Sequence, residues 1–322
     1  MKNLLKKLPL PVTGLMLGFA ALGNLIQSYS QGIRNVFGLI SFTILILILL
    51  KIIIFPKGVK EALENPVVAS VFPTTSMTIM LFATYIKPFS GSLANLFWFI
   101  GLILHIMLMA WFTQKFVLKK NYNIKKVFPS WFIPYVGIAV ASVSAPAVGM
   151  QAIGRIIFWF ALASFIILLP LVLKRVFIVK EIPEPALACM GILAAPASLC
   201  LAGYLNSFQL KNTAMVYSLL IVAQILYWGV ILYLPKMLKL KFYPKFYPSF
   251  SGFTFPLVIS GLGLKLSNGF LSKSGSPIAF LPILVNIEEI LAILACLFVL
   301  IKYLGFLFIK ENLQASSVEA GK

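Results

Sequence analysis

The side chains that could perform acid–base, nucleophilic or metal chemistry are few in this 322-residue sequence. It has no aspartate, its eight acidic residues are all glutamates, and His105 is its single histidine. Aspartyl proteases, zinc peptidases and histidine-dependent serine hydrolases each require a set of groups that these residues do not supply. No phosphate-binding loop or dinucleotide-binding fingerprint occurs either. We therefore expect no catalytic residue, no metal site and no cofactor.

Three ionisable side chains nevertheless lie within strongly apolar stretches. Glu288 and Glu289 occur in LPILVNIEEILAILACL, and His105 occurs in FIGLILHIMLMAW. The glutamates fit a proton-coupling site, or a place near a helix end where a partner or a subunit contact neutralises them. We interpret His105 as a packing residue with satisfied nitrogens rather than as a proton relay.

The elements that must position these side chains are transmembrane helices. The chain is 61% hydrophobic and 11% charged, with a mean hydropathy of +1.00, which is too apolar for a soluble protein of this length. A membrane-spanning helix needs about 20 apolar residues. Lysines precede the first apolar stretch as in a secretory signal, but nine more stretches follow, so we interpret it as the first transmembrane helix. The ten predicted spans are 10–28, 32–55, 66–86, 92–117, 129–148, 151–173, 183–205, 211–238, 248–267 and 277–308.

The formal charge of +19 would suggest nucleic-acid binding in a soluble chain, but its distribution argues against that partner. The termini and the even-numbered connections carry all but six of the 27 Lys and Arg. The positive-inside rule therefore predicts that both termini are cytoplasmic. The six remaining basic residues, on the outer side, are Arg34, Lys87, Arg155, Lys211, Lys265 and Lys273.

The odd-numbered spans repeat along the chain. Their prolines are Pro11, Pro73, Pro134, Pro196 and Pro256, which are separated by 62, 61, 62 and 60 residues. Because proline removes a backbone donor and clashes with the preceding turn, each odd helix should bend near its proline. Short outer and longer inner connections then predict five helical hairpins.

Small residues also gather on the odd spans, including Gly14 and Gly137. Backbone groups freed at a bend are tolerated beside protein or water but not beside lipid. We therefore expect the odd helices to form an inner ring around a central pore, with the even helices outside. The alternative is an ordinary bundle in which small residues only permit close packing.

Charge distribution favours anions over cations as the permeating ions. A cation pathway is normally lined by carboxylates, and the predicted inner helices carry none at membrane depth. Every outer turn carries a basic residue, and Arg34, Lys87, Arg155 and Lys211 could concentrate anions at the outer mouth. The same residues could instead be ordinary interfacial side chains that extend toward water.

Five stretches, taken in order, resemble the tellurite-resistance/dicarboxylate transporter family, which includes bacterial TehA-like channels and plant slow-type anion channels. They are LPLPVTGLMLGFAALGN, NPVVASVFPTTSM, PSWFIPYVG, PALACMGILAAPASL and YPSFSGFTFP. The resemblance covers about residues 8–310. It implies ten helices arranged as five hairpins with quasi-five-fold symmetry, a kinked inner ring around a pore, and a homotrimer.

The resemblance also implies a gate. In channel members of the family a phenylalanine beside the bend of the ninth helix closes the pore, and the stretch TFP places Phe255 there, before Pro256. Phe253 is the competing candidate. Relatives often have aromatic residues shortly before the gate, whereas this chain has Ser251 and Gly252. An apolar ring can stop permeation by steric blockage and dewetting.

These observations predict an anion channel or uniporter in a bacterial or archaeal plasma membrane, with small anions as substrate and the lipid bilayer as surroundings. A single ten-helix domain would cover residues 1–310, followed by a short cytoplasmic tail, 311–322. The alternatives are a proton-coupled carrier of C4-dicarboxylates and an exporter of sulfite or tellurite on the same scaffold.

Overall fold

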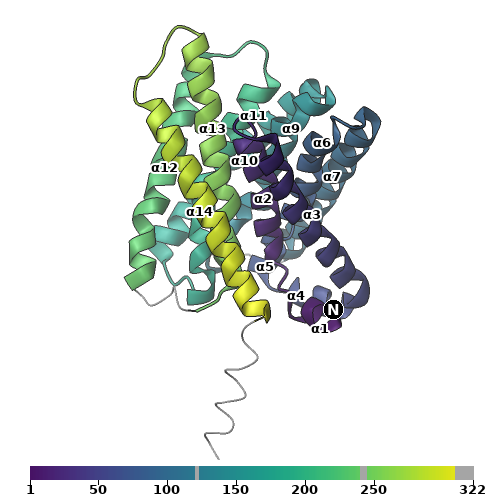
Figure 1. Ribbon diagram of the computed structural model, residues 1–322. Helices are drawn as coiled ribbons and strands as arrows, with labels where there is room; N and C mark the ends of the chain where they lie inside the picture. The colour runs from purple at the N-terminus through teal and green to yellow at the C-terminus, as the bar shows by residue number, and fades with distance from the viewer. Residues whose placement is uncertain (120–122, 240–244, 309–322) are drawn as a thin grey trace, which may run out of the picture.

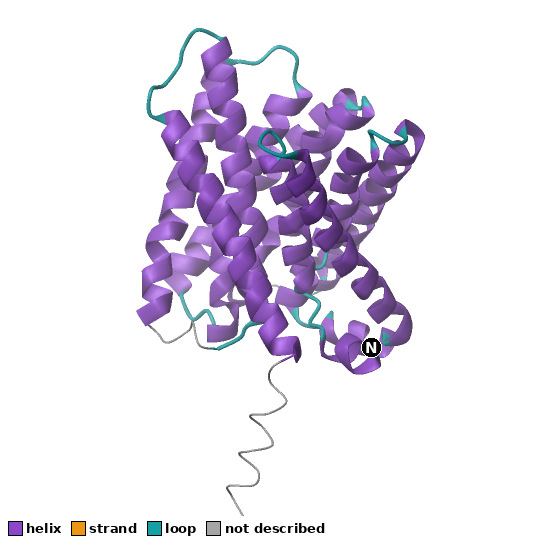
Figure 2. Ribbon diagram, viewed as in Figure 1, coloured by secondary structure: helices purple, strands orange, loops and turns teal. Residues whose placement is uncertain are grey.

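The computed structural model describes residues 1–119, 123–239 and 245–308, and every regular element in these ranges is a helix (Figure 2). Nine of the described helices are long and apolar enough to cross a membrane, and a shorter apolar helix precedes them. The prediction of an all-α integral membrane protein is therefore confirmed. The predicted tail, 311–322, lies outside the described residues.

The even-numbered spans are long helices. They are α3 (Gln31–Ile54), α7 (Gly91–Phe112) continued by the π-helix η1 (Thr113–Leu118), α10 (Gln151–Leu173) continued by the π-helix η5 (Lys174–Val179), α12 (Thr213–Lys239) and α14 (Leu281–Phe308). Only 22–33% of the most apolar window of each is buried in the protein. Their large exposed side chains, such as Leu39, Ile103 and Ile166, form a surface suited to lipid.

The odd-numbered spans are mostly built from short segments followed by a longer helix. They are α2 (Val12–Ile26); α5 (Pro66–Val71) with α6 (Thr74–Ile86); η3 (Pro129–Trp131), α8 (Phe132–Val136), η4 (Gly137–Ala139) and α9 (Val140–Val148); η6 (Glu184–Ala194) with α11 (Ala195–Ser207); and η7 (Pro248–Phe253) with α13 (Thr254–Lys273). In the four odd-numbered spans that are long enough to cross a membrane, 72–94% of an 18-residue apolar window is buried in the protein. In α2, every residue except Asn24 is buried.

The five prolines lie where the helical segments begin. Pro11 and Pro73 immediately precede α2 and α6, and Pro134, Pro196 and Pro256 lie within the first three residues of α8, α11 and α13. Proline is tolerated in a first helical turn because the amide hydrogen that it lacks has no intrahelical acceptor there. The predicted bends are therefore changes of helix type or breaks between helices, at the predicted positions.

The odd-numbered spans pack on one another in a closed order. Helix α2 contacts α6, α6 contacts α9, α9 contacts α11, α11 contacts α13, and α13 returns to α2. Each even-numbered span packs against the odd span that precedes it in the chain, as α14 does against α13 (Figure 1). The inner and outer sets thus have the arrangement that proline spacing and small residues predicted.

The long helices end at two opposite faces of the molecule (Figure 1). The N-terminal face carries α1 (Lys2–Lys7), α4 (Pro56–Ala62) and the 3₁₀ helix η2 (Ile124–Lys126), and the hairpin face carries the turns within the hairpins (Figure 1). On the N-terminal face, Lys51 Nζ donates to the carbonyl oxygens of Leu5 and Lys6, at 2.8 and 3.0 Å, and so caps the end of α1.

Candidate functional site

An inner cavity of about 40 Å³ lies at the centre of the closed set of helices. All five odd-numbered spans line it, and no acidic or basic side chain does so within the described part of the chain. The lining residues are Gly14, Val71, Thr74, Met77, Phe132, Ile133, Val136, Gly137, Cys189, Ile192, Ala195, Pro196, Leu199, Ser249, Ser251, Gly252, Phe255 and Pro256.

A second space, the outer cavity, lies toward the hairpin face and has a volume of about 380 Å³. It is lined from the same five odd-numbered spans and, in addition, by Arg34 of α3. Its polar lining includes Asn24, Thr84, Ser144 and Asn206. The two cavities therefore differ in character, since the inner one is narrow and uncharged and the outer one is wider and carries a cation.

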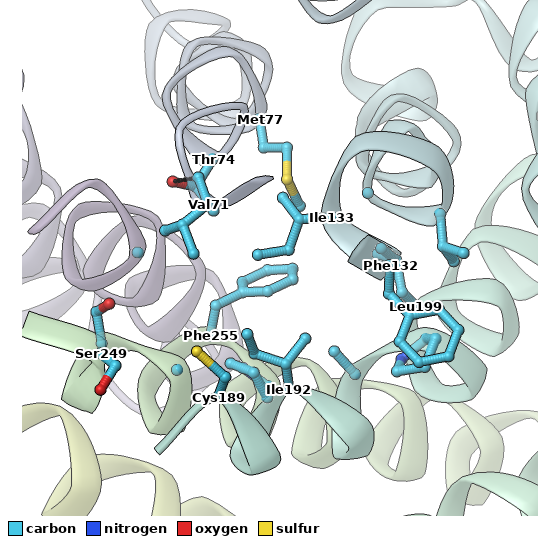
Figure 3. Close-up of a pocket in the computed structure, with 18 residues that line it drawn as sticks. Val71, Thr74, Met77, Phe132, Ile133, Cys189, Ile192, Leu199, Ser249 and Phe255 are labelled. Carbon is cyan, nitrogen blue, oxygen red and sulfur yellow. Dashed lines mark hydrogen bonds between the residues drawn. The ribbon is translucent and has the colours of Figure 1, made fainter. Parts of the chain in front are cut away.

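Phe255 is the residue that lines both cavities. Its side chain is 6% exposed, and Figure 3 shows its ring in the middle of the inner cavity, between Val71 and Met77 on one side and Cys189 and Ile192 on the other. The ring thus occupies the point where the narrow and the wide space meet.

The local backbone explains this position of Phe255. The 3₁₀ helix η7 ends at Phe253 and α13 begins at Thr254, so the chain changes helix type directly before the ring. The Thr254 hydroxyl shares its single hydrogen between the carbonyl oxygens of Gly14 and Ser251, which lie 2.9 and 2.8 Å from Oγ1. These bonds fix the start of α13 against α2.

Phe253 points elsewhere. It is buried but lines neither cavity. A Cβ atom added to Gly191 would lie 2.5 Å from Cδ1 of Phe253 and 2.5 Å from the carbonyl oxygen of Gly252. The ring of Phe253 therefore fills the close contact between η7 and η6, and the absence of side chains at Gly191 and Gly252 makes that contact possible.

The other residues predicted for the pore divide into two groups. Gly14, Gly137, Pro196 and Pro256 line the inner cavity. Pro11, Pro73 and Pro134 lie at helix junctions and do not line it. Spacing along the chain located these bends but did not indicate which side of each helix faces the axis.

The four outer basic residues that were predicted to concentrate anions at the outer mouth have different places relative to the outer cavity. Arg34 lines that cavity, whereas Lys87, Arg155 and Lys211 do not. Lys87 is exposed, and Arg155 and Lys211 are half-buried on the hairpin face. An even-numbered helix does not by itself exclude a residue from the cavity, because Arg34 lies on α3. Arg34 reaches the cavity because its side chain is directed at the inner helices, where it hydrogen-bonds to Asn24 of α2 and Thr84 of α6.

Arg34 is unusual among the basic residues because it is 5% exposed. Its Nε donates to Asn24 Oδ1 at 3.0 Å, and its Nη2 donates to the carbonyl oxygen of Thr84 at 2.8 Å. Its guanidinium carbon lies 4.3 Å from the centre of the Tyr85 ring, a cation–π contact. The cation is thus held against α2 and α6.

Sequence reasoning missed the polar residues of the outer cavity, although a signal for them exists. Asn24, Thr84, Ser144 and Asn206 recur at intervals of 60, 60 and 62 residues, close to the spacing of the prolines. Each follows the proline of its span by 10 to 13 residues. Applying the proline repeat to other positions would have found them as equivalent positions on one face of the inner helices.

His105 is a satisfied packing residue, as predicted. It is fully buried, with Nδ1 at 2.9 Å from Ser76 Oγ and Nε2 at 3.0 Å from the carbonyl oxygen of Pro134. Because a carbonyl oxygen only accepts, Nε2 donates to Pro134, and Nδ1 of the neutral ring accepts from Ser76. The single hydroxyl hydrogen of Ser76 is shared between Nδ1 and the carbonyl oxygen of Pro73. The imidazole therefore connects the bends of two neighbouring inner spans from its place on α7.

The adjacent glutamates have different surroundings. Glu289 accepts hydrogen bonds from Lys265 Nζ and from the Tyr29 hydroxyl, both at 2.7 Å. Glu288 is fully buried, with the side chains of Gln224, Ser260 and Tyr227 nearby. Within the described residues, neither of its carboxylate oxygens has a hydrogen-bond partner of good geometry. Neither glutamate lines the inner or the outer cavity.

These features define a multi-pass, all-helical membrane protein whose bent inner helices surround a narrow apolar cavity, an arrangement typical of transport proteins rather than of enzymes. A profile of the voltage-dependent anion channel family matches residues 7–304, and the chain belongs to this family. The family comprises channels and transporters.

A curated relative agrees with this assignment. The chain is 26% identical, over 218 residues, to the tellurite resistance protein TehA homolog of Haemophilus influenzae. The match covers 63% of this chain and 66% of the relative's length. The resemblance to the TehA-like family that the sequence motifs indicated is therefore confirmed.

Proposed function

We propose that the protein is an anion channel or uniporter that conducts small anions along the axis of its inner ring, with Phe255 as the gate. The observation that carries the proposal is the place of Phe255 at the junction of the inner and outer cavities. An apolar ring at a narrow point blocks hydrated ions by steric exclusion and dewetting, without any charge.

The sizes of the two cavities suggest how such a gate opens. The inner cavity, of about 40 Å³, is much smaller than the cavity of roughly 150 Å³ that accommodates benzene in an engineered protein. The outer cavity, of about 380 Å³, has room for a phenyl ring. We therefore propose that Phe255 opens by changing its rotamer toward the outer cavity.

Charge supports anions as the permeating species. Of the residues that the structure describes, none that lines the inner cavity has a carboxylate, and those that line the outer cavity include a cation, Arg34, and no acidic residue. The basic termini and even-numbered connections favour a cytoplasmic N-terminal face. We further propose a homotrimer in a prokaryotic plasma membrane, on the basis of the family resemblance.

A proton-coupled carrier is the second candidate, and Glu288 is the observation in its favour. A buried carboxyl group without a hydrogen-bond partner is a group that could bind and release a proton during transport. Its place between α14 and α13, outside both cavities, favours the channel.

Reversal potentials of the purified protein in planar bilayers test the proposal. Gradients of chloride, nitrate, sulfite and malate are imposed one at a time, and we expect the reversal potential to follow the anion gradient. A potential that follows the cation gradient would refute an anion pathway. Uphill transport driven by a proton gradient would replace the channel by the carrier.

A further inference from the structure

Arg34 is a buried cation without an acidic partner. The ion pairs within the described residues are Lys115–Glu64, Lys125–Glu181, Lys245–Glu184 and Lys265–Glu289, and none of them includes Arg34. The groups that contact its guanidinium are an amide oxygen, a backbone carbonyl, a hydroxyl and an aromatic ring, all of them neutral. Its positive charge is therefore stabilised by dipoles only.

The guanidinium of Arg34 also has N–H donors that make no hydrogen bond among the described residues. It carries five N–H groups. The described contacts are those of Nε with Asn24 and of Nη2 with Thr84, and none involves Nη1. Removing a charge from water without pairing it is costly, and buried charges are normally paired or hydrogen-bonded on all sides. An arginine of this kind that lines a cavity is suited to hold an anion there.

The lining of the outer cavity supplies further donors besides Arg34. Asn24 and Asn206 present side-chain amides, each of which donates one hydrogen bond to the protein, at 3.0 and 2.9 Å. Gln27 presents a third amide that is exposed and makes no hydrogen bond among the described residues. Among the residues that the structure describes, no acidic side chain lines this cavity, so no described side chain on its wall carries a negative charge.

We propose that Arg34 binds a small monovalent oxyanion in the outer cavity, on the hairpin-face side of Phe255. This inference rests on the proposed anion pathway and gives that pathway a loading site. One positive charge matches one negative charge, and the planar fork of a guanidinium matches two oxygens of a flat anion. The volume of about 380 Å³ exceeds that of such an ion, which would keep part of its water.

The planar guanidinium of Arg34, with its parallel N–H groups, favours an oxyanion over a halide as the ligand. A lysine would attract any anion as a point charge, whereas arginine adds two parallel hydrogen bonds that only an acceptor with two oxygens can receive together. We therefore expect the site to prefer nitrate to chloride, and we expect this preference to depend on the guanidinium rather than on charge alone.

Thermal unfolding of the full chain in detergent tests the site without measuring transport. Sodium nitrate replaces sodium gluconate at constant ionic strength, and the melting temperature is followed against nitrate concentration. The wild type should show a saturable rise. In Arg34→Gln the rise should vanish or need about tenfold more nitrate, because a charge-assisted interaction is lost. Arg155→Gln is the matched control and should behave as wild type.

Arg34→Lys provides a second comparison, which also decides the matter if Arg34→Gln does not fold. It keeps the charge and loses the fork, so the ratio of half-saturating chloride to half-saturating nitrate should fall toward one. An unchanged ratio overturns the proposal, as does a wild type without saturable stabilisation or an Arg34→Gln protein that saturates like the wild type.

Failure of the site and failure of the channel function give different results. If currents follow the anion gradient but nitrate stabilises Arg34→Gln as it does the wild type, the loading site is wrong and the channel stands. If nitrate binds through Arg34 but no variant conducts anions, the site stands and the channel is wrong.

Discussion

The hydroxyl of Thr254 donates a hydrogen bond to the carbonyl oxygen of Gly14, 2.9 Å away, and so joins the first and the last of the five inner spans. This contact closes the ring of helices one residue before Phe255. The proposed gate therefore lies next to the contact between α2 and α13, called the seam below, where the first and the last inner spans meet. Separating α2 from α13 at this seam should disturb the gate directly.

Replacing Phe255 by alanine should open the proposed pore. The substitution removes the ring from the junction of the two cavities, and we expect anion currents in planar bilayers to rise at least about tenfold, since each 1.4 kcal/mol of lost barrier is a factor of ten. Phe253→Ala should raise them less, because Phe253 packs on Gly191 outside both cavities. Equally low currents in Phe255→Ala and Phe253→Ala would refute the assignment of Phe255 as the gate.

Gly18→Ala tests the seam itself. A Cβ at Gly18 would lie 2.7 Å from the Cβ and 2.8 Å from the Oγ1 of Thr254, so α2 and α13 must move apart. Overpacking of this kind costs about 1–3 kcal/mol. We expect a lower melting temperature and a leakier channel. Gly269→Ala, on α13, is the control because no atom lies within 4 Å of its added Cβ; an equal loss in both variants would contradict the close packing at the seam.

Much of the fold could be predicted because apolar runs and proline positions can be read from the sequence without knowing how the helices pack. Apolar runs mark spans most of which agree closely with the structure, as 66–86 does with Pro66–Ile86, whereas the spans predicted to end at 173 and 267 continue to Val179 and Lys273. The proline spacing marks the junctions of the inner spans. The eleven-residue 3₁₀ helix η6 and the division of the fifth span into four segments were not predicted, because they depend on how neighbouring helices pack.

The site could be predicted only in part, for a similar reason. Phe255 came from a motif match, and its place between two cavities depends on five spans that are far apart in sequence. The burial of Arg34 and the pairing of Lys265 with Glu289 across 24 residues depend on side-chain direction. A count of charged residues along the outer turns does not show which way each side chain points. Arg34 and Lys87 were therefore indistinguishable in the sequence.

Lys87, Arg155 and Lys211 should influence anion entry only weakly. They lie on the hairpin face but outside the outer cavity, so their effect is a long-range field that salt screens within about 10 Å at 0.1 M. Changing all three to glutamine should reduce inward anion current at low salt and leave it nearly unchanged at 0.15 M or above. A loss that persists at high salt would place one of them in the pathway.

On the N-terminal face, the exposed pair of Lys125 Nζ and Glu181 Oε2, 2.8 Å apart, gives a pH prediction. The hydrogen bond from Lys125 and then its charge lower the pKa of Glu181 below its ordinary value of 4.5. Because the folded protein has the lower pKa, the pair stabilises it above pH 4.5 and loses that effect as the pH falls through the folded pKa. Glu181→Gln should therefore slightly lower the melting temperature at pH 7, and the difference from wild type should shrink in acid. A difference that grows in acid would contradict the pair.

The glutamates of α14 separate a channel from a carrier. Glu289 is paired with Lys265, so Glu289→Gln should leave Lys265 without its acid and lower stability while anion flux persists. Glu288 is fully buried without a hydrogen-bond partner, and a charged, unpaired carboxylate at membrane depth costs a few kcal/mol. We therefore expect Glu288 to be protonated, and Glu288→Gln, which keeps the shape of the neutral acid, to fold as well as wild type.

Flux measurements on these variants then distinguish the two mechanisms. In a channel, neither glutamate touches the pathway, because neither lines the inner or outer cavity. Glu288→Gln and the double variant Glu288→Gln/Glu289→Gln should both conduct anions in liposomes with nearly unchanged rate and pH dependence. A carrier needs a group that alternately binds and releases a proton, and glutamine cannot do so. If Glu288→Gln transports normally down an anion gradient but can no longer be driven by a proton gradient, the protein is a proton-coupled carrier and Phe255 is not the main element that controls its transport.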